Sequence, residues 1–139
     1  MIVLRPEIVR FESFAWEDVL LVAVERVGTR IVEEHGDAGP HAAFVDVPEQ
    51  SIHIRVQRAI GVDDLDDPAL GTAGVLVFYG APPADDRRRQ RITIACVVVG
   101  IRSEPGAGGR PPAKTIAFRA VSSGGSDPVT IGASGASEA

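Results

Sequence analysis

Two stretches of the chain, residues 51–57 and 91–97, alternate apolar and polar side chains with a period of two. This alternation places branched apolar side chains on one face of an extended segment and polar side chains on the other. Both stretches are therefore predicted to be half-buried β-strands. Aromatic residues make up only 5% of the 139 residues, so the core must consist mainly of Val, Ile, Leu and Ala, and the β-branched members of that set favour strands.

Further apolar segments predict strands at 19–26, 42–47, 75–79 and 114–121. The first of these is expected to end before Gly28. The second is predicted to form a hairpin with strand 51–58 through a tight turn at Pro48 and Glu49. The last is predicted to pair with strand 91–102 across a long loop rich in Gly and Pro.

The two ends of the chain are less regular. Residues 2–14 are expected to form an edge strand or an extended arm, because Pro6 interrupts a ladder; a short helix starting at Trp16 stays open. Residues 123–139 are rich in Ser, Gly and Ala, which predicts a flexible C-terminal arm with a short strand at 128–131. The whole pattern predicts a single, mainly β domain over 1–122, an antiparallel β-sandwich or barrel with long loops and at most one short flanking helix.

Cysteine usage and hydropathy bear on the compartment. Cys96 is the single cysteine, so no internal disulfide is possible and a reducing compartment is favoured. The first residues lack the basic start and apolar run of a secretory signal, so we expect cytosolic synthesis. No apolar run approaches the roughly 20 residues that a membrane-spanning helix needs. We therefore expect no membrane association.

The formal net charge is −5, which disfavours binding to a phosphate backbone. One basic run, at 87–91, interrupts this pattern. It directly follows Asp85 and Asp86 and leads into a predicted strand, so a solvated loop is favoured over a nucleic-acid contact.

Four carboxylates, those of Asp63, Asp64, Asp66 and Asp67, lie in one punctuated loop. Hard cations such as calcium prefer several carboxylate oxygens. The spacing does not match an EF-hand loop, and the bidentate glutamate of that motif is missing. A solvated acidic loop is therefore the favoured interpretation.

The candidates for a metal site or for catalysis are His35, His41, His53 and Cys96. The chain has none of the close Cys/His pairs that define a structural zinc site, so surface or interface histidines are favoured. It also has no phosphate-binding loop of the Walker type and no nucleophile elbow between a strand and a helix. We expect no cofactor, no metal and no enzymatic activity.

Three segments carry a family resemblance: VERVGTRIVEE at 24–34, DAGPHAAFVDVPE at 37–49 and RAVSSGGSDPV at 119–129. The chain resembles the tail tube proteins of long-tailed, siphovirus-like bacteriophages and of phage-like particles such as gene transfer agents. Members of this family have a β-sandwich or barrel with a flanking helix. This chain departs from that pattern because it offers no amphipathic helix of normal length.

The resemblance implies hexameric rings that stack into a tube, assembled in the host cytoplasm and located in the virion tail. DNA would pass through the channel without sequence-specific binding, and an acidic lumen would let it slide. Other tail proteins, namely the tape measure, terminator and baseplate, would be partners.

Two sets of residues follow from the resemblance as candidates. The candidate ring-stacking loop contains Glu33, Glu34, His35, Asp37 and Pro40, within a turn-rich stretch predicted to protrude as a loop at 33–40. The candidate inter-subunit arm contains Asp127, Val129 and Ile131. Both would become ordered only on assembly.

Two alternatives stay open. A tail terminator or a baseplate ring would share the features just described. From another class, a monomeric β-sandwich binding module for carbohydrate or protein fits the same strand pattern.

Overall fold

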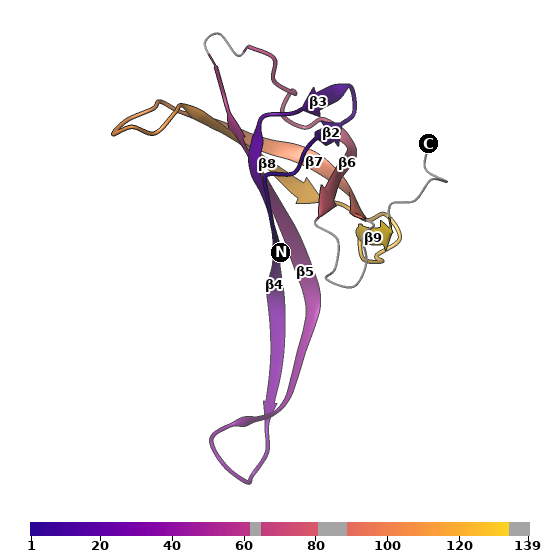
Figure 1. Ribbon diagram of the computed structural model, residues 1–139. Helices are drawn as coiled ribbons and strands as arrows, with labels where there is room; N and C mark the ends of the chain where they lie inside the picture. The colour runs from indigo at the N-terminus through magenta and orange to yellow at the C-terminus, as the bar shows by residue number, and fades with distance from the viewer. Residues whose placement is uncertain (62–64, 81–88, 134–139) are drawn as a thin grey trace.

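A computed structural model describes residues 1–61, 65–80 and 89–133 of the chain (Figure 1). The described residues form nine strands and no helix, which confirms the predicted mainly β fold. The strands are β1 (Ile2–Leu4), β2 (Val9–Phe11), β3 (Phe14–Trp16), β4 (Val19–His35), β5 (Ala42–Ala59), β6 (Ala73–Gly80), β7 (Gln90–Glu104), β8 (Ala113–Ala120) and β9 (Val129–Ala133).

All pairings are antiparallel, and the strand order is β1-β4-β5-β8-β7-β6-β2-β3, with β9 added to β7. The sheet curls over on itself. The ring of Phe118 in β8 packs edge-on against the ring of Phe11 in β2, with 4.9 Å between their centres, although β7 and β6 separate these strands in the order. Likewise, the guanidinium of Arg58 in β5 lies 5.4 Å from the ring centre of Trp16 in β3. The result is a barrel-like domain with two short edge strands, β1 and β3.

The alternation predicted from the sequence sets the core. In β5, Ile52, Ile54 and Val56 are buried, whereas the residues between them are exposed or half-buried. Strands β7 and β8 follow the same rule. The buried apolar side chains that line the interior include Val9, Phe11, Trp16, Val22, Leu76, Phe78, Ile92, Ile94, Cys96, Ile116 and Phe118.

The predicted hairpin with a turn at Pro48 and Glu49 is wrong. Residues 42–59 form one continuous strand, β5, and its partner is β4. Pro48 is tolerated because the ladder is irregular there: Glu49 pairs with Arg30 and Asp46 pairs with Val32, with register shifts on both sides of Arg30. Such bulges accommodate a residue without an N–H donor.

The expected end of the first strand at Gly28 is also wrong, because β4 continues to His35. Gly28 faces Gln50 across the hairpin, and a Cβ at this position would come within 2.8 Å of Val47 Cγ1. The absent side chain therefore makes room for the partner strand. The loop predicted at 33–40 is displaced. Residues 33–35 belong to β4, and the turn comprises residues 36–41.

The predicted long-loop hairpin is confirmed, since β7 pairs with β8 along Cys96–Glu104. At the N-terminus, β1 pairs with β4 as an edge strand, and β2 and β3 form a small hairpin on β6. The helix considered at Trp16 does not occur: that residue ends β3. At the other end, β9 extends the sheet beside Gln90–Ile94 of β7, close to the short strand expected at 128–131. Residues 134–139 of the expected arm lie outside the described residues.

Candidate functional site

The most conspicuous feature of the fold is a hairpin that extends well beyond the barrel (Figure 1). We call residues 25–51 the hairpin arm. β1, with Met1 and Arg5 on either side of it, covers the edge of β4 only from Leu20 to Val24, and β8 covers the edge of β5 only along His53–Ala59. Beyond these points, the described part of the chain provides no further strand on either edge. From Glu25 to His35, at about 3.3 Å per residue, the arm reaches roughly 35 Å.

The arm exposes large apolar side chains. Ile31, Phe44 and Val45 are 59%, 51% and 56% exposed. Phe44 and Val45 are adjacent in β5, so they point to opposite faces of the hairpin. An isolated two-stranded ribbon is marginally stable in water, and apolar side chains on both of its faces are typical of a surface that another chain covers.

The five residues predicted for a stacking loop all lie at the tip of the arm and are all exposed. Glu33, Glu34 and His35 end β4, and Asp37 and Pro40 lie in the turn that follows. Residues 33–46, which we call the arm tip, carry four carboxylates, contributed by these two glutamates, Asp37 and Asp46, and neither Lys nor Arg. The structure therefore brings the predicted loop residues together as an acidic end of a long arm.

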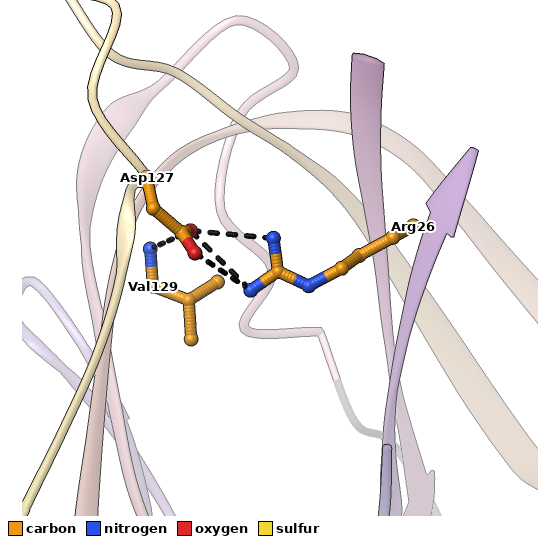
Figure 2. A network of polar contacts seen from close by, with 3 residues as sticks. All are labelled: Arg26, Asp127 and Val129. Carbon is orange, nitrogen blue, oxygen red and sulfur yellow. Dashed lines mark hydrogen bonds and ion pairs between the residues drawn. The ribbon is translucent and has the colours of Figure 1, made fainter. Parts of the chain in front are cut away.

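The base of the arm is tied to the C-terminal part of the chain. Nη2 of Arg26 in β4 donates to Oδ2 of Asp127 over 3.0 Å, and Nη1 donates to Oδ1 over 3.3 Å (Figure 2). Oδ1 of Asp127 also accepts the backbone N–H of Val129 over 3.0 Å, at the start of β9. These contacts lower the pKa of Asp127, mainly through the Val129 N–H and then through Arg26. A hollow beside this network is lined by Gln50 and Pro128 among others.

The residues predicted for an inter-subunit arm thus make contacts within the subunit. Asp127 holds Arg26, Val129 packs against the core, and Ile131 pairs with Ile92 of β7 while its side chain stays 51% exposed.

In the acidic loop, Asp63 and Asp64 lie outside the described residues. Asp67 accepts a hydrogen bond from Nζ of Lys114 over 2.6 Å, and the Lys114 side chain is only 2% exposed. Asp66 is exposed. The acidic loop therefore includes one carboxylate that forms a hydrogen bond with a buried lysine of the domain.

Part of the basic run is also described. Arg87 and Arg88 lie outside the described residues, whereas Arg89 forms an ion pair with Glu7. The hydrogen bonds from Arg89 lower the pKa of Glu7. The described end of the run thus contacts a carboxylate of the N-terminal segment.

The candidate metal ligands are dispersed. His35 and His41 lie at the arm tip, His53 lies on the outer face of β5, and Cys96 is buried in β7. Within 1–61, 65–80 and 89–133, no group of three metal-binding side chains is gathered. Burial raises the pKa of the Cys96 thiol to about 12, so at neutral pH it is a packed, protonated core group.

One surface was not predicted from the sequence. Cross-strand partners share a face of a sheet, and the outer faces of β5, β8 and β7 place Arg55, Arg119 and Arg102 on neighbouring strands. All three side chains are exposed. We call these arginines, with His53, the basic face. Alternation alone assigns Arg55 to the outer side of its strand, but the register is needed to bring the arginines together.

Comparison with known proteins gives no family assignment: no protein-family model matches the chain, and no curated protein matches its sequence. Among the described residues, no helix is long and apolar enough to cross a membrane.

Proposed function

We propose that this chain is a self-assembling structural protein: a tail tube subunit that forms hexameric rings, which stack into the tube of a phage or phage-like particle. The observation that carries the proposal is the hairpin arm, with its uncovered edges and its exposed Ile31, Phe44 and Val45. Covering each of these half-exposed side chains would contribute about 1 kcal/mol to association.

The arm also suits a ring in geometric terms. An arm of one subunit that contacts a different surface of the next subunit makes a heterologous contact, and such contacts close into rings when the rotation between subunits permits. Exposed strand edges are satisfied in the same step, which prevents uncontrolled edge-to-edge association. The resemblance of 24–49 and 119–129 to tail tube proteins favours stacked hexamers among the possible rings.

The proposal places the protein in the virion tail, after assembly in the host cytoplasm. The tape measure, terminator and baseplate proteins would be its neighbours, and DNA would pass through the channel without being read. No cofactor or chemistry enters this role.

The test is electron microscopy of the purified protein across a concentration series, with light scattering for mass. Rings or tubes with sixfold symmetry are expected. The matched control has a shortened arm: Gly28 and Gln50, which pair across the hairpin, are joined by a two-residue Asn-Gly turn. This variant is expected to stay folded and monomeric.

Two results would contradict the proposal. A strict monomer at high concentration, even with tape-measure and baseplate components added to nucleate assembly, would favour the binding-module alternative. Normal rings from the arm-shortened variant would remove the arm from the assembly mechanism.

A further inference from the structure

We propose that the acidic arm tip of one subunit docks on the basic face of a second copy of this chain. The inference rests on the proposed self-assembly and identifies the surface that receives the arm. The basic face consists of Arg55, Arg102, Arg119 and His53 on the outer side of β5, β8 and β7.

The charges of the two surfaces are complementary. The arm tip carries Glu33, Glu34, Asp37 and Asp46 without a cation. On the basic face, neither Arg55 nor Arg119 forms an ion pair with any residue that the structure describes. Opposed patches of this kind steer association and fix its register.

The carboxylates near the basic face neutralise its positive charge only in part. Glu25 faces His53 across the β4–β5 ladder, and Glu104 lies 3.5 Å from Nε of Arg102, whose side chain is 80% exposed. Both contacts are at the margin of the face. Its centre, Arg55 and Arg119, remains positive.

The two surfaces also match in their apolar parts. Phe44 is exposed on one face of the arm tip and Val45 on the other, so either face of the tip can place one apolar side chain against Val97 and Val99, which lie beside the arginines on the outer side of β7. A contact that combines an apolar patch with a charged surround resembles the usual anatomy of a protein interface.

The arm tip of a subunit does not reach the basic face of the same subunit. The arm is a straight continuation of β4 and β5, and it carries the tip away from the barrel (Figure 1).

Nucleic acid is the competing occupant of a surface rich in arginine. The net charge of −5 and the dense carboxylates of the same chain favour a protein partner with an acidic projection, which this chain itself supplies.

Charge reversal tests the contact. One variant carries Glu33→Lys and Glu34→Lys, and another carries Arg55→Glu and Arg119→Glu. Each alone is expected to need about tenfold more protein, or greater, to assemble. The first variant cancels the net charge of the arm tip, where Asp37 and Asp46 remain, and the second brings like charges together. Mixing the two variants is expected to restore assembly in part, since the new lysines then meet the new glutamates, the unmodified tip meets the unmodified face, and a ring of six can alternate. The control, Glu17→Lys with Arg110→Glu, reverses exposed charges elsewhere and is expected to assemble like the unmodified chain.

A second readout does not depend on ring formation. Asp37→Cys in one preparation and Ala117→Cys in another place thiols at the tip and on the face, and Cys96 is buried. Oxidation of the concentrated mixture is expected to give a disulfide-linked dimer, and added salt is expected to reduce its yield.

The outcomes separate this inference from the proposed function. Rings that form normally from the Arg55→Glu, Arg119→Glu variant would overturn the inference and leave the tube proposal standing. If that variant also lost retention on DNA, the basic face would be a nucleic-acid surface instead. Both proposals would be overturned if the unmodified chain formed no rings and the mixed Asp37→Cys and Ala117→Cys chains gave no disulfide-linked dimer.

Discussion

Arg26 and Asp127 connect the base of the hairpin arm to the loop before β9: Nη2 of Arg26 donates to Oδ2 of Asp127 across 3.0 Å. The two residues are separated by 101 positions in the sequence. Because Asp127 also accepts the N–H of Val129, one carboxylate holds both the arm and the start of the last strand.

Replacing Asp127 with Ala is therefore expected to loosen β9 more than replacing Arg26 with Gln. The Arg26 and Asp127 side chains are about half exposed, so the ion pair alone contributes little, and Arg26→Gln should reduce amide protection in β9 by roughly two- to fivefold. Hydrogen exchange measured by NMR checks this order. Equal protection in both variants would show that the Val129 contact does not hold the strand.

The same contacts predict a pH dependence. The pKa of Asp127 is lowered in the folded chain, so its stabilising contribution is present above the ordinary carboxyl value of 3.8 and is lost as the pH falls through the lower, folded value. The Val129 amide shift should therefore titrate with a midpoint below 3.8, and this titration should disappear in Asp127→Asn. A midpoint at or above 3.8 would contradict the network.

The strand segments of the barrel could largely be predicted from the sequence, because local alternation decides them. Ile52, Ile54 and Val56 repeat every second position, and the prediction needed no partner strand. The arm could not be predicted in the same way. Pro48 and Gly28 disfavour strands by local preference. They are accommodated only in the paired hairpin, where the ladder is irregular near Pro48 and the absent side chain of Gly28 makes room for Val47.

The residues of the candidate site likewise fall into two groups: those that local sequence predicts and those that depend on long-range pairing. The arm-tip residues Glu33, Glu34 and Asp37 could be named from turn composition and resemblance, since they are close together in the sequence. The basic face depends on strand order and register: Arg55, Arg102 and Arg119 are distant in sequence and share one face of adjacent strands only because β8 lies between β5 and β7. The role of Asp67 as a partner of buried Lys114 also depends on a long-range contact.

Two phenylalanines should separate folding from assembly. Phe118 is 1% exposed and packs on Phe11, so Phe118→Ala is expected to lower the free energy of unfolding by about 3–5 kcal/mol. Phe44 is half exposed on the arm, so Phe44→Ala should change it by less than about 0.5 kcal/mol while weakening assembly. Urea unfolding of dilute protein, together with light scattering at high concentration, measures both. A large destabilisation by Phe44→Ala would show that the arm packs on its own domain.

The turn between β2 and β3 depends on a glycine in β6. Glu12 has a positive φ of 52° and its Oε1 accepts the N–H of Val75 over 3.1 Å, so its side chain lies directly over Gly74. A Cβ at Gly74 would overlap the Glu12 side chain. Gly74→Ala is therefore expected to cost about 0.5–1.5 kcal/mol of folding stability, because the exposed Glu12 side chain must move and give up its hydrogen bond to Val75.

A double-mutant cycle identifies the cause. In a Glu12→Ala background, Gly74→Ala should cost clearly less, because the overlapping carboxylate is gone. Urea titrations of the four chains give the coupling energy. Additive effects would show that the cost at Gly74 comes from the strand itself and not from Glu12.

Strand β8 carries a buried cation, Lys114. Lys114 is 2% exposed and donates to Asp67 over 2.6 Å, and a hydrogen bond between charged groups is worth about 1.5–3 kcal/mol. Asp67→Ala should therefore destabilise the fold by about that amount, whereas Asp66→Ala, in the same loop but without a hydrogen bond or ion pair to any described residue, should have little effect. Adding Lys114→Met to Asp67→Ala should recover part of the loss, because an apolar side chain of similar length needs no carboxylate. Thermal and urea unfolding at constant salt compare the four chains, and equal stability of the Asp66 and Asp67 variants would show that this contact does not stabilise the domain.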